Sequence, residues 1–210
     1  KYQFKILQGQ TGSAKTKILN CLNNMNAQVI DLENLACHRG SLLGSEINKK
    51  QHSQRYFESL LHNAIDKFDC TKPIFIESES SKIGKLHLPK KLWLKLNESD
   101  RLLLNVPIDE RIKFLLKEYK HLTKDCKLIQ PFISGMKGKV SNEKLSNWTN
   151  LIQKQDWKNF VKDILENHYD PRYNFSATKH MNKIKHKIDI IKLDKLSIDN
   201  ASKKILEYFN

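Results

Sequence analysis

The sequence predicts an α/β protein in which a parallel sheet is flanked by helices and followed by a helical segment near the C-terminus. Short apolar runs alternate with segments that have the spacing of amphipathic helices, as expected of strand–helix–strand units. In addition, the apolar run at residues 2–7 leads at once into a glycine-containing loop and a helical pattern with Ile18, Leu19 and Leu22. That order of strand, loop and helix is typical of phosphate-binding proteins. We therefore expect a P-loop NTPase-like fold.

The loop at residues 9–16 reads Gly-Gln-Thr-Gly-Ser-Ala-Lys-Thr, a Walker A pattern with one departure. Backbone N–H groups of such a loop surround phosphate oxygens, and the following helix N-terminus adds partial positive charge. Lys15 would reach the outer phosphate, and the Thr16 hydroxyl would face Mg²⁺. Ala14 stands where a second glycine is usual, so we expect it to keep a negative φ. The predicted phosphate-binding residues are Gly9, Gln10, Thr11, Gly12, Ser13, Ala14, Lys15 and Thr16.

The elements that follow are recognised by the same two patterns. Residues 27–32, 73–76 and 101–106 are short apolar runs, which predict buried strands. Apolar residues at helical spacing predict helices between these strands and after them, at 53–66, around 92–96 and at 109–122.

The character of the chain changes near Gly135, where two glycines lie in a lysine-bearing linker. Apolar residues at helical spacing then predict one long helix over 143–168, and a last strand over 188–193 and a closing helix over 198–209 complete the pattern. We therefore expect a P-loop core at residues 1–134. A helical extension at 135–210 would return to that core with the last strand and helix.

The charge of the chain favours a polyanionic partner. Its 210 residues carry 37 lysines and arginines against 23 acidic residues, a net charge of +14. In an α/β-type sequence such an excess favours nucleic acid over a membrane as the partner. No apolar run approaches the roughly 18 residues that span a bilayer. The alternative is that the positive charge reflects a proteome rich in Lys, Asn and Ile and no particular partner. The run from 111 to 139, which includes Lys117, Lys120 and Lys124, has eight basic residues against two acidic ones.

The four cysteines lack the spacing of metal or redox motifs. Reduced thiols and a cytoplasmic location are therefore expected.

Polar residues follow the second and third predicted strands, where ligands gather in open α/β sheets. Glu77 occupies the position of a Walker B acid that would hold Mg²⁺, although a strand-ending carboxylate can also cap a helix. Glu79 is the second choice for that role. His38 is a candidate general acid or base, or else a hydrogen-bonding member of its loop, and Arg39 is a candidate phosphate contact. The candidate catalytic residues are His38, Arg39, Glu77 and Glu79.

Residues 169–173 read Tyr-Asp-Pro-Arg-Tyr, which places two phenols and an arginine around a proline. Tyr169, Arg172 and Tyr173 suit stacking on an unpaired base. A tyrosine-anchored corner between a helix and a strand is the alternative.

Taken together, these motifs resemble the P-loop half of the tRNA 2-selenouridine synthases. The matching pieces occur in the family's order, at residues 9–16, 31–41, 53–58, 77–84 and 169–173. The resemblance implies a transferase that converts the 2-thiouridine at the tRNA wobble position to 2-selenouridine. In that family, geranyl diphosphate alkylates the sulfur and selenophosphate then replaces it. With tRNA as the partner, the expected tRNA contacts are the basic and aromatic candidates Arg39, Lys117, Lys120, Lys124, Tyr169, Arg172 and Tyr173.

The family's rhodanese half, with its reactive cysteine loop, has no counterpart in these 210 residues. We expect that half either in the same longer chain or in a separate polypeptide, and we do not interpret Cys37 as its nucleophile. Taken alone, the residues equally describe an ATP-dependent small-molecule or nucleoside kinase, with Mg²⁺ and a nucleoside triphosphate at Lys15. A nucleic-acid-binding module without catalysis is the third hypothesis.

Overall fold

The computed structural model describes residues 1–38, 51–77, 80–181 and 187–209. Its centre is a five-stranded parallel sheet with strand order β2-β3-β1-β6-β7. The strands are β1 (Gln3–Gly9), β2 (Gln28–Ile30), β3 (Pro73–Glu77), β6 (Asp100–Asn105) and β7 (Ile188–Lys192). The predicted fold class is confirmed. Because the chain adds β2 and β3 on one side of β1 and the later strands on the other, the end of β1 is a topological switch point.

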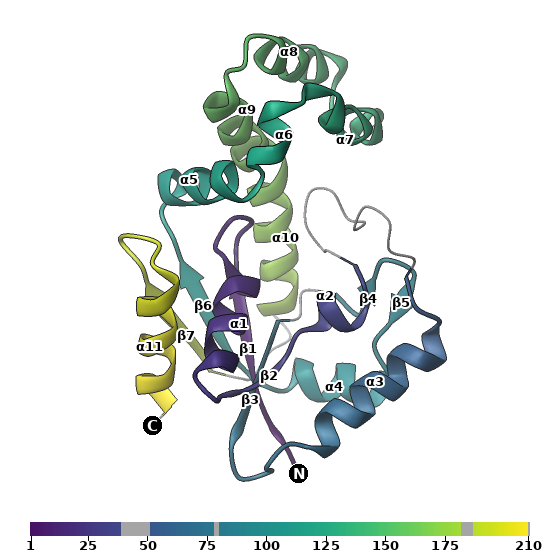
Figure 1. Ribbon diagram of the computed structural model, residues 1–210, viewed down its shortest axis with the longest axis vertical. Coiled ribbons are helices and arrows are strands. Elements are labelled where there is room, and N and C mark those ends of the chain that lie inside the picture. The colour runs from purple at the N-terminus through teal and green to yellow at the C-terminus, as the bar shows by residue number, and fades with distance from the viewer. Residues whose placement is uncertain (39–50, 78–79, 182–186, 210) are drawn as a thin grey trace.

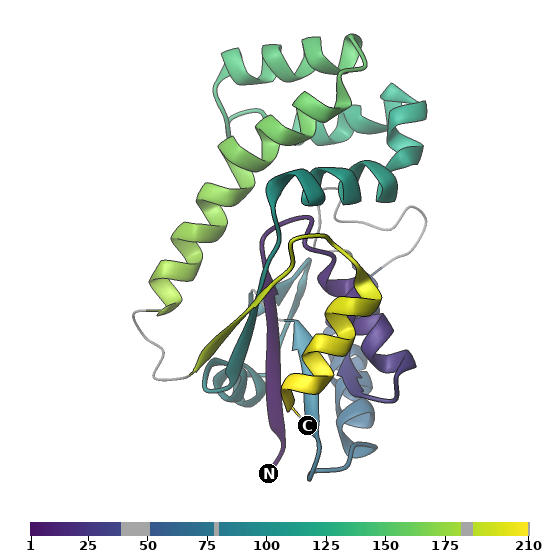
Figure 2. The ribbon, with the colours of Figure 1, turned by 90° about the vertical axis from the view of Figure 1, so that its left-hand side faces the viewer.

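Helices cover both faces of the sheet (Figures 1 and 2). On one face, α1 (Lys15–Asn24) and α11 (Ile198–Phe209) pack on Leu7, Phe75 and Leu104. The other face carries α2 (Leu32–Leu35), α3 (Gln54–Asp66), α4 (Lys90–Asn97) and a small hairpin of β4 (Lys82–Ile83) and β5 (Leu86–His87).

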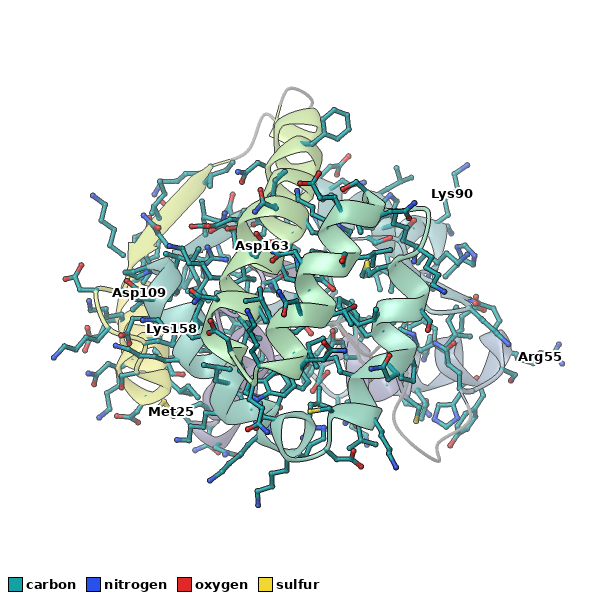
Figure 3. The ribbon with its side chains drawn as sticks, turned by 90° about the horizontal axis from the view of Figure 1, so that it is seen from above. Met25, Arg55, Lys90, Asp109, Lys158 and Asp163 are labelled. Carbon is teal, nitrogen blue, oxygen red and sulfur yellow. The ribbon has the colours of Figure 1, made fainter. Side chains whose placement is uncertain are left out.

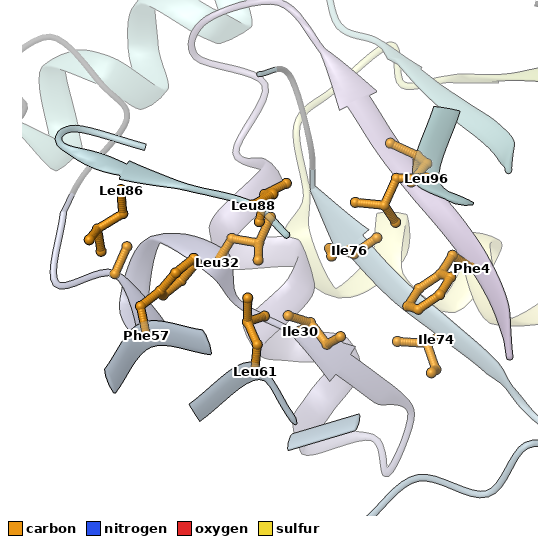
Figure 4. Packing of buried hydrophobic residues seen from close by; sticks show 12 residues of the cluster. Phe4, Ile30, Leu32, Phe57, Leu61, Ile74, Ile76, Leu86, Leu88 and Leu96 are labelled. Atoms are coloured by element: carbon orange, nitrogen blue, oxygen red, sulfur yellow. The ribbon is translucent and has the colours of Figure 1, made fainter. Parts of the chain in front are cut away.

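Side-chain alternation along each strand produces these two cores. Phe4 and Ile6 face the α3 side, whereas Leu7 faces α1. Figure 4 shows the α3-side core, where Phe57 of α3, Leu32 of α2 and Leu86 of the hairpin lie together over the sheet.

A helical lobe sits above the carboxyl ends of the strands (Figure 1; from above in Figure 3). It is built from α5 (Ile108–Glu118), α6 (Lys120–Lys124), a 3₁₀ turn (Cys126–Ile129), α7 (Gln130–Met136), α8 (Asn142–Gln153) and α9 (Trp157–Ile164). Its core is centred on the fully buried Trp148, whose Nε1 donates a hydrogen bond of 2.6 Å to Asp163 of α9. This cluster extends from Leu122 to Ile164 and so includes residues on both sides of the expected boundary at 134/135.

Two long helices expected from the sequence are each divided. The helix expected over 143–168 ends at Gln153, because Gln155 adopts a φ of 57° and the Asp156 side chain then caps α9 by accepting from the Asn159 N–H. The helix expected over 109–122 ends at Glu118 and restarts at Lys120. Apolar spacing continues across both breaks because all the pieces pack on one lobe core, so spacing alone does not reveal them.

The segment at 169–173 is helical, so the alternative of a tyrosine-anchored corner between a helix and a strand is wrong. A π-helical turn (Leu165–Tyr169) joins α9 to α10 (Asp170–Met181), which runs back toward the sheet (Figure 2). The Asp170 N–H donates to the Leu165 carbonyl, a wider bond than that of an α-helix. Pro171 has no N–H to donate, and a wide turn just before a proline relieves its clash with the preceding carbonyl.

No helix among the described residues is long and apolar enough to span a bilayer.

Candidate functional site: the phosphate loop and its surroundings

The phosphate loop joins the central strand to α1, as the sequence predicts. Ala14 differs from expectation, because it adopts the left-handed conformation with φ 59° and ψ 27°. Its carbonyl accepts the Ile18 N–H at 2.9 Å, so Ala14 is the residue at which the chain turns into the helix. An L-residue pays about 1–2 kcal/mol for this conformation. The alanine thus takes the backbone geometry for which a glycine is usual.

Gly9 and Gly12 of the loop each lack room for a side chain, but for different reasons. A Cβ on Gly9 would lie 2.5 Å from the Ser13 Oγ, because the loop folds over the end of β1. Gly12 has a φ of +87°, and a Cβ there would lie 3.0 Å from the Leu115 Cδ1 and 3.1 Å from the Arg111 Cβ. The loop therefore touches α5 directly.

Lys15 lies at the first position of α1, and its Nζ donates a hydrogen bond of 2.6 Å to the Gly9 carbonyl. The ammonium thus crosses the loop between its two ends. A phosphate oxygen offers a stronger, charge-assisted acceptor than a neutral carbonyl. The side chain is therefore placed to move from the loop carbonyl to a bound phosphate.

Glu77 is the last residue of β3 and lies beside Leu7 of β1 in the sheet register. It is 8 % exposed. Since Phe75 packs on the α1 side, alternation places Glu77 on that side as well, next to the helix that begins with Lys15 and Thr16. Glu79 lies outside the described residues.

The donor set fits Mg²⁺ that arrives with a phosphate ligand. In the described part of the chain, no group of three His, Cys, Asp or Glu side chains could hold a metal by itself. Mg²⁺ is usually held by one or two protein oxygens together with phosphate and water. Thr16 and Glu77 can supply those protein oxygens.

The segments that follow β2 and β3 meet each other at the hairpin turn. The Asp31 side chain accepts the Asn34 N–H at 2.9 Å and caps α2. Burial raises the pKa of Asp31, against the lowering effect of that hydrogen bond. His38 is half-buried, and its Cδ2 lies so close to the hairpin turn that a Cβ on Gly84 would be 2.5 Å away. Arg39 lies outside the described residues.

The segment before α3 holds the hairpin in place. The Gln51 side chain donates to the Ile83 carbonyl at 2.7 Å and accepts the Lys85 N–H at 2.8 Å. Next to it, the Cys37 Sγ lies 3.1 Å from the His52 Nε2. His38 thus packs against a hairpin turn that Gln51 holds by hydrogen bonds. Its predicted role as a general acid or base stays a prediction.

The predicted tRNA contacts differ in exposure. Lys117, Lys120, Lys124 and Arg172 are exposed, as a phosphate-binding surface requires. Tyr169 packs on the lobe core, and burial, followed by the neighbouring Tyr119, raises its pKa. That placement agrees with an anchoring role better than with base stacking.

Tyr173 is half-buried and interacts electrostatically with Arg101 of β6. Arg101 is only 5 % exposed, and burial lowers its pKa.

Sequence reasoning missed one pair at the site, Arg111 and Asp170. The Arg111 guanidinium donates to both carboxylate oxygens of Asp170, at 2.9 and 2.8 Å, and also to the Thr11 carbonyl of the phosphate loop at 3.1 Å. The sequence places Arg111 in a basic run and Asp170 in the motif at 169–173, without relating one to the other. No local pattern relates an arginine to a loop 100 residues away.

Comparisons with known proteins agree with the motifs. The family profile described as the tRNA 2-selenouridine synthase AAA domain matches residues 2–155. The tRNA 2-selenouridine synthases of Marinobacter nauticus and Sulfurovum sp. are 30% and 29% identical, over 87% of this chain in both cases. The chain covers 56% and 57% of those proteins, so it spans about half the length of the curated relatives that it matches. Among solved structures, a shikimate kinase from Bacteroides thetaiotaomicron superposes with a TM-score of 0.41 and 12% identity, over 99% of this chain and 98% of the kinase.

Proposed function

Because the chain belongs to the tRNA 2-selenouridine synthase AAA-domain family, we propose that it is the phosphate-binding part of a tRNA-modifying transferase. The reaction is the conversion of wobble 2-thiouridine to 2-selenouridine through S-geranylation. Its cosubstrates are geranyl diphosphate and selenophosphate. The observation that supports this proposal is the phosphate loop itself, with Lys15 at the start of α1 and reaching across the loop to Gly9.

The loop suits a reaction in which diphosphate departs. As the sulfur bonds to the geranyl carbon, the carbon–oxygen bond breaks and negative charge grows on the diphosphate. Donors fixed around that charge, the loop N–H groups and the Lys15 ammonium, stabilise it as it forms. Mg²⁺ held by Thr16 and Glu77 would neutralise part of the same charge. A phosphate loop can therefore serve this reaction without ATP hydrolysis.

The remaining parts of the proposal concern partners. The tRNA backbone would contact Lys117, Lys120 and Lys124 of the lobe and Arg172 of α10, because those side chains are exposed. The relatives are longer than this chain, which leaves room for a rhodanese domain that supplies the nucleophile. That domain would act in cis or in trans.

The first test is pyrophosphate binding by isothermal titration, with Lys17→Ala as the matched control for Lys15→Ala. Lys17 lies on the same helix, is about half exposed and pairs with Glu118 at 3.1 Å. Lys15→Ala should weaken binding by about 10- to 100-fold, the loss expected for a charge-assisted contact. Lys17→Ala should change it little. Equal affinities for the two variants would contradict the assignment of the loop.

Geranyl diphosphate, selenophosphate and ATP are then compared as ligands in thermal unfolding. A ligand at about 100 times its Kd should add about 2.7 kcal/mol to the free energy of unfolding. Stabilisation by ATP alone, together with ATP turnover, would favour the kinase instead.

The second test is mass spectrometry of wobble nucleosides after incubation with tRNA, selenophosphate and geranyl diphosphate. The chain by itself should bind both tRNA and geranyl diphosphate without producing 2-selenouridine. Adding a rhodanese domain should restore conversion. Full conversion by this chain alone would overturn the division of labour and make Cys37 the candidate nucleophile.

A further inference from the structure

We propose that Arg111 and Asp170 are positioning residues for the phosphate loop, through which the helical lobe controls phosphate affinity. The proposal rests on the proposed function only in that the loop binds phosphate. Neither residue belongs to the Walker motif, and neither needs to touch the ligand.

Arg111 contacts the phosphate loop at the peptide group between Thr11 and Gly12 and so influences the orientation of that peptide. In a planar trans peptide, the Thr11 carbonyl and the Gly12 N–H point in opposite directions. Arg111 holds that carbonyl at 3.1 Å, and a Cβ on Gly12 would lie 3.1 Å from the Arg111 Cβ and from its carbonyl oxygen. The guanidinium thus lies on the carbonyl side of this peptide. The Gly12 N–H is directed to the other side, where it can donate to a ligand held by the loop.

Arg111 keeps this place because Asp170 holds it. The Arg111 side chain is 4 % exposed and the Asp170 side chain 15 %. A guanidinium fork on a carboxylate fixes orientation as well as charge. Without the carboxylate, a buried cation would be left uncompensated and would turn toward water or another acceptor.

Asp170 in turn depends on the lobe. It is the first residue of α10, and its N–H completes the π-helical turn by donating to Leu165, which is fully buried in the lobe. Lobe packing therefore sets the position of the carboxylate, the carboxylate sets the guanidinium, and the guanidinium sets the Gly12 amide. By linkage, a phosphate in the loop should stabilise the start of α10 by the same free energy.

The test is Asp170→Asn, measured as the Kd for inorganic pyrophosphate. This variant keeps the side-chain shape and loses one charge. We expect about a tenfold or greater loss of affinity, because the Gly12 amide is no longer held in the binding orientation.

Two controls separate positioning from simpler effects. Glu118→Gln removes a carboxylate from the same helix as Arg111, one that pairs with Lys17 and not with the loop. It should bind pyrophosphate as well as the unaltered chain or slightly better, since a nearby negative charge is gone. Asp163→Asn removes the charge and one of the two acceptor oxygens that serve Trp148 and Asn167 inside the lobe. It should lower the melting temperature and leave the Kd within about twofold.

Amide NMR of the ligand-free chain distinguishes a change in the position of the loop from a general loss of stability. Asp170→Asn should shift the Gly12 N–H resonance, and Asp163→Asn should not. Arg111→Lys keeps one donor for the Thr11 carbonyl and loses the fork, so its Kd should fall between those of the unaltered chain and Asp170→Asn. If Asp170→Asn does not fold, Arg111→Lys carries the same comparison.

Unchanged pyrophosphate affinity in Asp170→Asn would overturn the inference, and so would a loss equal to that of Asp163→Asn. If Lys15→Ala weakens binding while Asp170→Asn does not, the inference alone fails. If neither variant weakens binding, the phosphate-binding proposal fails with it.

Discussion

The guanidinium of Arg111 and the carboxylate of Asp170 form a two-point ion pair behind the phosphate loop, at 2.9 and 2.8 Å. The pair joins the first helix of the lobe to the helix that returns from it. It is also the point at which the motif at 169–173 meets the Walker motif. Arg111 therefore links the two motifs through one buried ion pair.

Removing one member of this pair should cost more than removing both. Arg111→Met leaves a buried carboxylate uncompensated, so the free energy of unfolding should fall by about 3–5 kcal/mol. Adding Asp170→Leu should recover most of that loss, because apolar replacements of buried ion pairs are often nearly neutral. Urea titrations measure both values. The double variant should remain weak in pyrophosphate binding, and a double variant with normal affinity would argue against the positioning role.

Gly12→Ala should be the most damaging of three matched glycine substitutions. It combines a positive φ with contacts of 3.0–3.1 Å to Leu115 and Arg111. Gly138→Ala meets only the positive φ, since nothing lies within 4 Å, and should cost about 1–2 kcal/mol. Gly135→Ala meets neither problem inside α7 and should stabilise by about 0.5–1 kcal/mol. Equal losses at Gly12 and Gly138 in denaturant titrations would show that α5 yields to the extra methyl group.

Ala14→Gly should stabilise the protein or leave it unchanged. Relief of the left-handed strain, about 1–2 kcal/mol, exceeds the entropy cost of a glycine, about 0.5–1 kcal/mol. The sign follows from the φ of 59° and is opposite to that for a residue with negative φ. Ala201→Gly in α11 is the control, and it should destabilise by at least about 0.5–1 kcal/mol. A loss of that size at Ala14 would contradict the left-handed conformation.

Acid should weaken the lobe through His168. Burial lowers its pKa from 6.5, and Arg172, Lys139 and Lys144 lower it further. The unfolded chain therefore binds a proton that the folded one excludes. The stability that the neutral His168 contributes is therefore fully present above about pH 6.5. As the pH falls below that value, the free energy of unfolding decreases by up to about 1.4 kcal/mol per pH unit. His168→Phe should flatten this part of the stability–pH curve, and His62→Gln, at an exposed site on α3, should not. An unchanged slope in His168→Phe would assign the acid sensitivity elsewhere.

Binding to tRNA should fall steeply with salt. If roughly 6–8 phosphates are neutralised, the slope of log K against log salt should be roughly −4 to −7. Changing Lys117, Lys120 and Lys124 together to Gln should reduce the slope by about 2–3. The control changes Lys1, Lys67 and Lys72, which are exposed and come before β1 or between α3 and β3 in the chain. Figure 1 shows that β1 and β3 begin at the end of the sheet away from the lobe. Affinity independent of salt would remove the nucleic-acid surface, and equal effects of the two triples would place it elsewhere.

The sequence by itself determined the sheet and the phosphate loop, because both depend on local patterns. An apolar strand that leads into a glycine loop and a helix start specifies its own hydrogen bonding, and the side-chain alternation of each strand specifies its buried faces. The resemblance of the motifs also pointed to the family that the profile match shows. At Ala14 the tertiary structure differs from the local preference of an alanine for negative φ. The turn into α1 uses a left-handed residue at this position, whichever side chain that residue carries.

Only the tertiary structure decided what lies behind the loop. The breaks at Tyr119 and Gln155 do not interrupt the apolar spacing, so the lobe could not be divided from the sequence. The helical path through Pro171 depends on a π-helical turn that no propensity predicts. Arg111 and Asp170 pair because the lobe folds α10 back toward the sheet. Contacts between residues so far apart in the chain are specified by the packing of whole helices, which local spacing does not encode.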